Sequence, residues 1–171
     1  ATKPYEQLSN VYKAVKGIAD NVPQAQLKFY RKSDNKEVED KSLTALFERP
    51  NPYMSKNDLI QSIVGYYALF GELFLIKQKS VRQSSVEGRG EKYKGLPAEL
   101  WVFNPTHFKE LVSKNGDELL GWKSGNERFS LDQVIHSKDF NPYNNFRGLA
   151  PQKVLEKLID IDWASLIYNQ A

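Results

Sequence analysis

The sequence predicts an α+β fold, in which helices pack on a small, mostly antiparallel sheet and a long helix forms the C-terminal part. Three observations support this class. Apolar residues recur at helical spacing in three parts of the chain, short β-rich runs lie between these parts, and the order of segments is helix, strand, helices, strands, helix. With 171 residues, 40% of them hydrophobic, the chain is long enough for one domain with a single core.

The first 48 residues predict a helix, a strand and a second, short helix. Apolar residues at three-four spacing predict the first helix over residues 4–19. The alternating stretch from Gln26 to Lys32 predicts a half-exposed strand, and a polar loop follows it. The run SLTALFE then predicts a short helix over residues 42–48.

Two prolines follow that helix and predict a stiff, extended elbow at residues 49–52. A proline disfavours helical backbone in the residue before it, so Pro50 and Pro52 push Arg49 and Asn51 out of the helical region. Ser55 then serves as the N-cap of a new helix, with Asp58 completing a capping box. This helix should end near Gly71, a residue favoured at helix C-termini.

The second half predicts strands and a final helix. The apolar run at 72–77 is typical of a buried strand, and the polar, glycine-containing segment 78–95 of a loop or long hairpin tip. Further strands are expected at 99–105, 107–113, 119–125 and 134–140, with a hairpin turn at Asn115–Gly116 and a loop at 141–148. Pro151 suits the first turn of the last helix.

Apolar residues of the last helix lie around more of its circumference than one core-facing stripe needs. Two explanations stay open: simple burial within the domain, or cover of the second face by a neighbouring subunit or a downstream segment. The chain begins at Ala1 and stops at Ala171 inside a helical pattern, so we expect a fragment of a longer protein.

Composition argues against most kinds of chemistry. The absence of cysteine excludes disulfides and thiolate sites, and the two histidines, His107 and His136, have no partner at metal-ligand spacing. His136 is interpreted as a hydrogen-bonded structural histidine at a strand end. No phosphate-loop, dinucleotide or nucleophile motif is present, so we expect no cofactor, no metal and no enzymatic activity. No apolar run reaches the length of a membrane span, and we expect no membrane partner.

Positive charge is concentrated in one predicted loop, although the net charge of the chain is only +3. The candidates for a DNA contact are Lys79, Arg82, Arg89, Lys92 and Lys94. The alternatives are a solvated loop and a weak, sequence-independent contact with phosphate. A binding module for nucleic acid or protein that uses loop 77–94 is therefore the second hypothesis for the function.

The order of motifs is more informative than any single one. LTALFERPNPYMSKNDLIQSIVGYYALFGELFLIK, then ELWVFNP, VIHSKDF and FRGLAPQKVLEKLI, resembles the portal (head-tail connector) proteins of tailed bacteriophages over residues 43–167. FGELF departs from the Gly-Asn-Ala-Tyr common in such portals, and Ala150 replaces the usual serine before Pro151. The motif positions that match are Pro50, Asn51, Pro52, Gly71, His136, Gly148 and Pro151, which in portals shape the fold.

The resemblance implies the N-terminal wing portion of a portal: residues 1–148 as a wing-like α+β domain and 149–171 as a helix leading toward the stem. It further implies a homo-oligomeric ring, typically a dodecamer, at one capsid vertex of the virion. Double-stranded DNA would pass through this ring without specific binding during packaging and ejection. The implied partners are terminase, capsid and head-tail adaptor proteins, with assembly in the host cytoplasm. The nearly balanced charge suits a conduit, because every phosphate bound would slow the passage of DNA.

Overall fold

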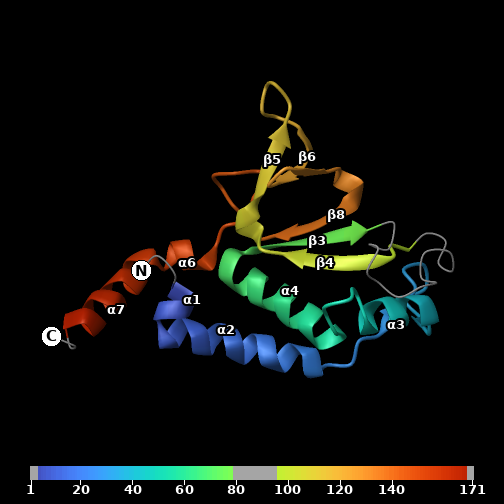
Figure 1. Ribbon diagram of the computed structural model, residues 1–171, viewed down its shortest axis with the longest axis horizontal. Coiled ribbons are helices and arrows are strands. Elements are labelled where there is room, and N and C mark those ends of the chain that lie inside the picture. Colours follow the sequence, from blue (N-terminus) through green and yellow to red (C-terminus); the bar gives the residue numbers. More distant parts are fainter. Residues whose placement is uncertain (1–3, 79–95, 169–171) are drawn as a thin grey trace.

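The computed structural model describes residues 4–78 and 96–168. Two three-stranded antiparallel sheets lie one above the other, with strand orders β4-β3-β8 and β5-β6-β7. Helices α2 and α4 lie below the first sheet, α3 lies at one end of the molecule, and α6 and α7 extend from the other end (Figure 1). The expected α+β class, with helices packed on antiparallel strands, is confirmed, but the strands form separate small sheets instead of the single sheet that was expected.

The N-terminal helix is interrupted where the sequence predicted one continuous helix. It consists of α1 (Pro4–Gln7) and α2 (Ser9–Asn21), followed by the 3-10 turn η1 (Val22–Gln24). Leu8 adopts extended backbone between the two helices and its side chain is buried. Val15 and Ala19 form the buried side of α2.

A two-stranded hairpin follows, formed by β1 (Phe29–Tyr30) and β2 (Glu37–Val38). The expected strand is thus only two residues long, and the prediction that residues 37–38 belong to a loop was wrong. Phe29 pairs with Val38, so the partner that defines β2 lies nine residues away. Helix α3 (Lys41–Glu48) begins directly afterwards, with the Asp40 carboxylate accepting hydrogen bonds from the first-turn amides.

Helix α4 (Lys56–Phe70) has the predicted caps at both ends. The Ser55 side chain accepts a hydrogen bond from the Asp58 amide, and the Asp58 carboxylate accepts one from the Ser55 amide. Gly71 ends the helix in the left-handed conformation at φ 63°, which glycine adopts without steric cost.

The first sheet is centred on the predicted buried strand. This strand, β3 (Glu72–Gln78), pairs on one side with β4 (Glu99–Phe103) and on the other with β8 (Val134–Lys138). Phe74 and Ile76 face the second sheet, whereas Leu75 faces α3 and α4. Because side chains alternate along a strand, β3 contributes to both hydrophobic clusters of the molecule.

The second sheet consists of β5 (Phe108–Val112), β6 (Leu119–Ser124) and β7 (Glu127–Phe129). Asn115–Gly116 lies in the β5–β6 connection, but that connection runs from 113 to 118 and is wider than a two-residue turn. His107 belongs to the 3-10 turn η2 (Pro105–His107) rather than to a strand. The sequence reading missed β7, which returns through a tight turn at Gly125 and Asn126 and leads to η3 (Leu131–Gln133).

The aromatic core lies between the two sheets. Its buried members are Phe74, Ile76, Phe108, Trp122, Phe129 and Val134. The Phe74 and Phe108 rings stack with centroids 4.3 Å apart, and Trp122 meets Phe74 edge-on at 4.6 Å. A smaller cluster of Leu46, Leu59, Leu75 and Leu100 joins α3 and α4 to the first sheet. These contacts fix both sheets and α4 as one frame.

The C-terminal segment forms two helices where the sequence predicted one. Helix α6 (Pro151–Val154) begins at the expected proline, and α7 (Glu156–Tyr168) follows after a break at Leu155. The backbone of Leu155 leaves the helical region, with φ −95° and ψ 7°. The loop predicted at 141–148 is confirmed and carries the chain from β8 to α6.

Candidate functional site

The structure divides the motif residues singled out in the sequence between two places. Gly71, His136, Gly148 and Pro151 lie around the start of β3, where β8 ends and α6 begins; we call this region the β3 junction. Pro50, Asn51 and Pro52 lie at the edge strand β4, and we call residues 49–54 the elbow.

Glu72 and Arg147 form the centre of the β3 junction. The Arg147 guanidinium donates from Nε to both Glu72 carboxylate oxygens, at 3.0 and 3.1 Å, and from Nη2 to Oε1 at 2.5 Å. Its terminal nitrogens also bind main-chain carbonyls: Nη1 that of Phe108 (2.7 Å) and Nη2 that of Pro105 (3.0 Å). Arg147 therefore ties its loop both to the first sheet and to the segment that opens the second.

Glu72 is buried but fully occupied as an acceptor. Besides Arg147, its carboxylate faces His136 Nε2 at 3.1 Å and accepts the Gly148 amide at 3.0 Å. Burial by itself raises the pKa of Glu72, but the hydrogen bonds from His136, Arg147 and Gly148 outweigh it and lower the pKa to about 2. The carboxylate is thus held ionised at neutral pH.

His136 lies in the middle of β8 and not at a strand end as expected. It pairs in register with Phe74, stacks on that ring at 4.3 Å and meets Trp122 edge-on at 4.7 Å. The Arg147 guanidinium carbon lies 5.6 Å from the Phe74 ring centroid and 5.9 Å from that of Trp122. The imidazole therefore serves as a spacer between the aromatic core and Glu72.

Two glycines let the backbone segments of the junction approach closely. A Cβ at Gly148 would overlap the Gly71 carbonyl oxygen, and a Cβ at Gly71 would overlap the Leu149 carbonyl oxygen. The Gly71 carbonyl accepts the Asp139 amide at 2.7 Å. The end of α4, the end of β8 and the start of α6 are thus joined within a few ångströms.

Asp139 extends this network to α4. The Tyr67 hydroxyl donates to Asp139 Oδ1 at 2.6 Å, and this hydrogen bond raises the pKa of Tyr67. Asn141 Nδ2 donates to the Gly148 carbonyl at 3.2 Å. Both ends of the 141–148 loop are therefore held by side-chain hydrogen bonds, which fixes the point at which α6 leaves the sheet.

The elbow is a tight turn bound to the outer edge of β4. The Pro50 carbonyl accepts the Leu100 amide at 2.8 Å, and Asn51 Nδ2 donates to the Leu100 carbonyl at 2.9 Å. Asn51 is 1% exposed, and its Oδ1 accepts the Tyr53 amide at 3.0 Å. The prediction of an extended linker was wrong at Pro52, because Asn51 and Met54 form an antiparallel bridge around a turn at Pro52–Tyr53. The elbow covers an edge strand that would otherwise offer unpaired groups.

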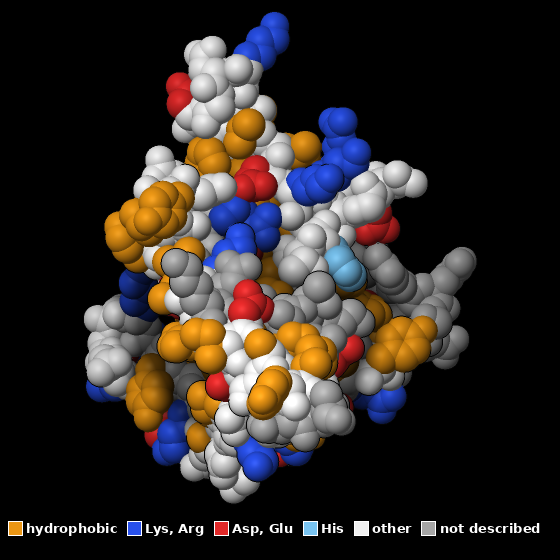
Figure 2. Space-filling view, turned by 90° about the vertical axis from the view of Figure 1, so that its left-hand side faces the viewer, with side chains coloured by type: hydrophobic (Ala, Val, Ile, Leu, Met, Phe, Trp, Pro, Cys, Tyr) orange, Lys and Arg blue, Asp and Glu red, His pale blue; other side chains and the backbone are white. Residues whose placement is uncertain are grey.

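Most apolar side chains of the C-terminal segment, which contains α6 and α7, are exposed. Ile159 is buried, but Leu158 and Ile161 are 63% and 64% exposed. Simple burial of the last helix, one of the two explanations considered for its sequence, is therefore wrong for the chain alone. We call the following exposed residues the α7 face: Val154, Leu155, Leu158, Ile161, Leu166, Ile167 and Tyr168. Figure 2, viewed toward the end of the molecule from which α7 extends, shows hydrophobic side chains gathered in its lower half.

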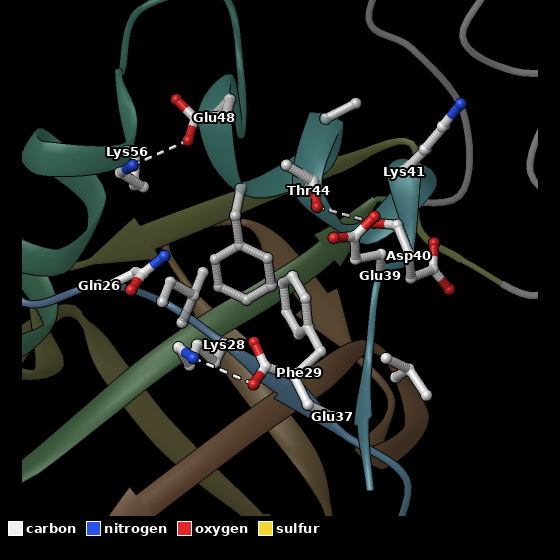
Figure 3. Close-up of a pocket in the computed structure, with 14 residues that line it drawn as sticks. Gln26, Lys28, Phe29, Glu37, Glu39, Asp40, Lys41, Thr44, Glu48 and Lys56 are labelled. Atoms are coloured by element: carbon white, nitrogen blue, oxygen red, sulfur yellow. Dashed lines mark hydrogen bonds and ion pairs between the residues drawn. The ribbon is translucent and has the colours of Figure 1, made fainter.

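A cavity of about 610 Å³ lies between the β1–β2 hairpin and α3 (Figure 3). Its charged groups serve local structure: Lys28 pairs with Glu37 at 3.0 Å, Lys56 pairs with Glu48 at 2.8 Å, and Asp40 caps α3. In the part of the chain that is described, no three His, Asp or Glu side chains are grouped as metal ligands. No helix within 4–78 or 96–168 combines the length and apolar character needed to cross a bilayer.

The basic residues proposed as DNA contacts are Lys79, Arg82, Arg89, Lys92 and Lys94, and all lie outside the described residues. Sequence reasoning missed the two central residues of the junction, Glu72 and Arg147. The only signal for Glu72 was that a charged residue begins an otherwise apolar strand, which requires a buried partner. Arg147 carried no signal of its own, because its partner lies 75 residues away in the sequence.

The sequence and the fold of this chain match those of known proteins. The family model described as "Phage portal protein" matches residues 9–171. An uncharacterized protein of Rickettsia bellii (strain RML369-C) is 21% identical over 177 residues, which cover 98% of this chain and 42% of that protein.

Solved structures share the fold. The neck of an empty gene transfer agent (GTA) particle, computed with C6 symmetry, matches with a TM-score of 0.78 and 19% identity over 97% of this chain and 43% of the other. The neck of the native particle, computed with C12 symmetry, matches with a TM-score of 0.71 and 17% identity over 99% and 43%. The native virion matches with a TM-score of 0.74 and 18% identity over 99% and 42%. The chain spans less than half the length of each of these relatives.

Proposed function

The chain belongs to the phage portal protein family, and from this membership we propose that it is part of a subunit of a homo-oligomeric ring at one vertex of a capsid. Double-stranded DNA passes through the ring during packaging and ejection. The observation that carries the proposal is the agreement of family and fold: the family model matches residues 9–171, and neck structures computed with C6 and C12 symmetry share the fold over nearly the whole chain.

The α7 face supplies a surface on which a second copy can pack. Its seven side chains are between 44% and 83% exposed and lie around much of the circumference of the helix. The largest apolar patch on an ordinary monomer is about 300–600 Å² and is often functional. We therefore assign the α7 face to contact with the neighbouring subunit, which requires a different surface on that neighbour if the ring is to close.

The β3 junction gives this face a fixed position. Glu72, Arg147 and Gly148 join the loop before α6 to β3, so α6 leaves the sheet at a point set by hydrogen bonds rather than by a free linker. On this basis residues 1–148 form the wing-like domain and residues 149–171 lead from it toward the stem of the parent protein. The motif residues act by shaping this frame, without chemistry of their own.

The remaining parts of the proposal follow from the family. Terminase, capsid and head-tail adaptor proteins are the expected partners, and the virion is the expected location after assembly in the host cytoplasm. The protein has a structural role and no enzymatic activity. A contact of Lys79, Arg82, Arg89, Lys92 and Lys94 with passing DNA stays a prediction.

Particle images of the parent protein test the proposal. We expect closed rings with a central channel, in which the α7 face lies at a subunit boundary. A parent protein that stays monomeric at every concentration tested would contradict the proposal. Charge reversal at Arg82, Arg89 and Lys92 should leave ring formation unchanged, which separates assembly from any role of the basic loop.

A further inference from the structure

Three positively charged side chains lie side by side across the second sheet. In the antiparallel register, Lys109 of β5 lies opposite Lys123 of β6, and Lys123 lies opposite Arg128 of β7. Directly opposite residues in neighbouring strands have Cα atoms about 4.5 to 5.5 Å apart. We call these three residues the cation row.

Each member of the row faces away from the core. Phe108, Trp122 and Phe129 are buried, and each is the immediate strand neighbour of one of the three cations. Because side chains alternate between the two faces of a strand, the cations lie on the outer face. Lys109 and Arg128 are exposed and Lys123 is partly exposed. Figure 1 shows β5 and β6 rising from the molecule on the side opposite α2 and α4, so this sheet projects outward.

The row has no counter-charge among the side chains that the structure describes. Among the described residues, no ion pair or hydrogen bond of these three side chains is formed. The ion pairs formed between side chains that the structure describes include those of Lys16, Lys28, Arg31, Lys56, His136 and Arg147, and none involves the row. The nearest carboxylate along β5, Glu110, is turned to the other face, where Asn144 and Arg147 engage it.

This arrangement is unfavourable without a ligand. Like charges directly opposite one another destabilise an antiparallel pair, and here two such pairs share Lys123. A negatively charged surface laid across the strands would remove this repulsion and gain three ionic contacts.

The composition of the row favours nucleic acid over protein as the source of that charge. Lysine is depleted at protein–protein interfaces, where buried aromatic anchors supply most of the binding energy. The cation row has two lysines and one arginine, and the aromatic residues beside it point into the core. A straight row of closely spaced cations matches the repeated charge of a phosphate backbone, which binds by releasing counterions.

We propose that the outer face of β5–β6–β7 binds the phosphate backbone of double-stranded DNA through Lys109, Lys123 and Arg128. The contact is weak, independent of base sequence and quenched by salt, so DNA can slide across it. The ring described above requires only that DNA pass through it and assigns no contact to this sheet. The choice of duplex DNA as the ligand rests on the proposed function, whereas the place of the contact rests on the strand register and not on ring assembly.

A salt titration with a labelled 30-base-pair duplex of random sequence tests the proposal. Fluorescence anisotropy between about 20 and 200 mM NaCl gives the slope of log K against log salt, which changes by about 0.9 for each phosphate contact. The triple variant Lys109→Gln, Lys123→Gln, Arg128→Gln should reduce the slope by between about 2 and 3 and weaken binding at 50 mM NaCl by more than about tenfold. If the triple variant is misfolded by circular dichroism, Lys123→Gln alone should reduce the slope by about 0.9.

A charge-matched control keeps the test specific. Lys13 on α2 and Lys32 and Lys36 in the β1–β2 connection are exposed. The variant Lys13→Gln, Lys32→Gln, Lys36→Gln therefore changes the net charge equally without touching the row. Equal loss of binding in both triple variants, or no loss in the row variant, would overturn the proposal. Equally tight, row-dependent binding of a poly-glutamate peptide would also overturn it, because the partner would then be an acidic protein surface.

The same variants separate this inference from the proposed function. The parent protein carrying the triple row variant should still form rings while its duplex binding falls. If the parent protein forms no rings but still binds the duplex through the cation row, the proposed ring would be contradicted and the proposed DNA contact would stand.

Discussion

Glu72 brings three segments of the chain together through one carboxylate. It accepts hydrogen bonds from the Arg147 side chain and the Gly148 amide and contacts His136 Nε2, so the strand, the loop and β8 share a single buried charge. Removing one partner of such a buried pair leaves the other uncompensated, which is far more costly than losing a surface ion pair.

Glu72→Gln should lower the free energy of unfolding at pH 7 by about 3 kcal/mol, because Arg147 then lacks its counter-charge. The pKa of Glu72 is about 2 in the folded chain against 4.5 for the free side chain, so the carboxylate stabilises the fold fully above about pH 4.5. That contribution is lost as the pH falls from about 4.5 toward 2. Urea unfolding from pH 7 to pH 3 should therefore show wild type and variant converging.

Glu39→Gln provides the matched control, because Glu39 is an exposed carboxylate. Its stability should stay within about 0.5 kcal/mol of wild type across the same range. A Glu72→Gln variant that remains equally destabilised at pH 3 and pH 7 would contradict the ionic role of the junction.

Asn51→Ala should cost about 2 kcal/mol, because the buried Leu100 carbonyl and the Tyr53 amide each lose a partner. Asn51→Asp should cost more, since it keeps the acceptor but places a charge at a site that is 1% exposed. Asn57→Ala on the exposed surface of α4 is the control and should have little effect. Equal midpoints of urea unfolding for the Asn51 and Asn57 variants would show that the elbow is not held by this side chain.

Elements whose limits are set by local chemistry could be predicted from the sequence. Helix α4 begins at Ser55 and ends at Gly71 because a capping box and a left-handed glycine are encoded within a few residues. Pro151 opens α6 for the same reason. The strand at 72–77 was recognisable from its apolar run, because it is covered on both faces.

Elements defined by distant partners could not be predicted in the same way. Strand β2 has two residues and exists through its pairing with β1, and β7 has three residues and depends on β6. The bend at Pro52–Tyr53 is set by the hydrogen bonds that Pro50 and Asn51 make with Leu100, which the prolines alone do not reveal. The Glu72–Arg147 pair likewise needs the tertiary fold, whereas Gly71, His136 and Gly148 were found through their motif positions.

The close approach of β3 and the loop before α6 makes a prediction at the scale of elements. Gly148→Ala should lower the free energy of unfolding by about 2 to 3 kcal/mol, because the new Cβ overlaps the Gly71 carbonyl and the Glu72 side chain. Gly65→Ala is a matched control within α4, where a Cβ meets open space. It should raise stability by about 0.5 to 1 kcal/mol. Thermal unfolding of the Gly148→Ala and Gly65→Ala variants measures both effects. Equal stabilities of the two variants would show that the backbone segments at the β3 junction can move apart without cost.

On the scale of the whole molecule, the packed part of the chain and the exposed helix α7 differ in how their apolar side chains are covered. Two sheets, α4 and the β3 junction form a rigid body with its own aromatic core, whereas the α7 face has no equivalent cover within the described residues. A subunit with its own packed core and an exposed apolar helix is suited to assembly with further copies of itself.

Leu158→Asp with Ile161→Asp should abolish ring formation by the parent protein, because both side chains are more than half exposed and belong to the α7 face. The melting temperature of the chain itself should change by only a few degrees. Leu120→Asp, at an apolar position 55% exposed on β6, serves as the control and should leave rings intact. Unfolding of the isolated subunit by the double variant would show that the α7 face is covered within one chain instead.

The most direct measurement is electron microscopy of the purified parent protein over a range of concentrations, with wild type and the Leu158→Asp, Ile161→Asp variant imaged side by side. We predict closed rings with a central channel for wild type and single subunits for the variant. Wild-type protein that yields only single subunits or open filaments, with no closed ring in any class average, would contradict the account.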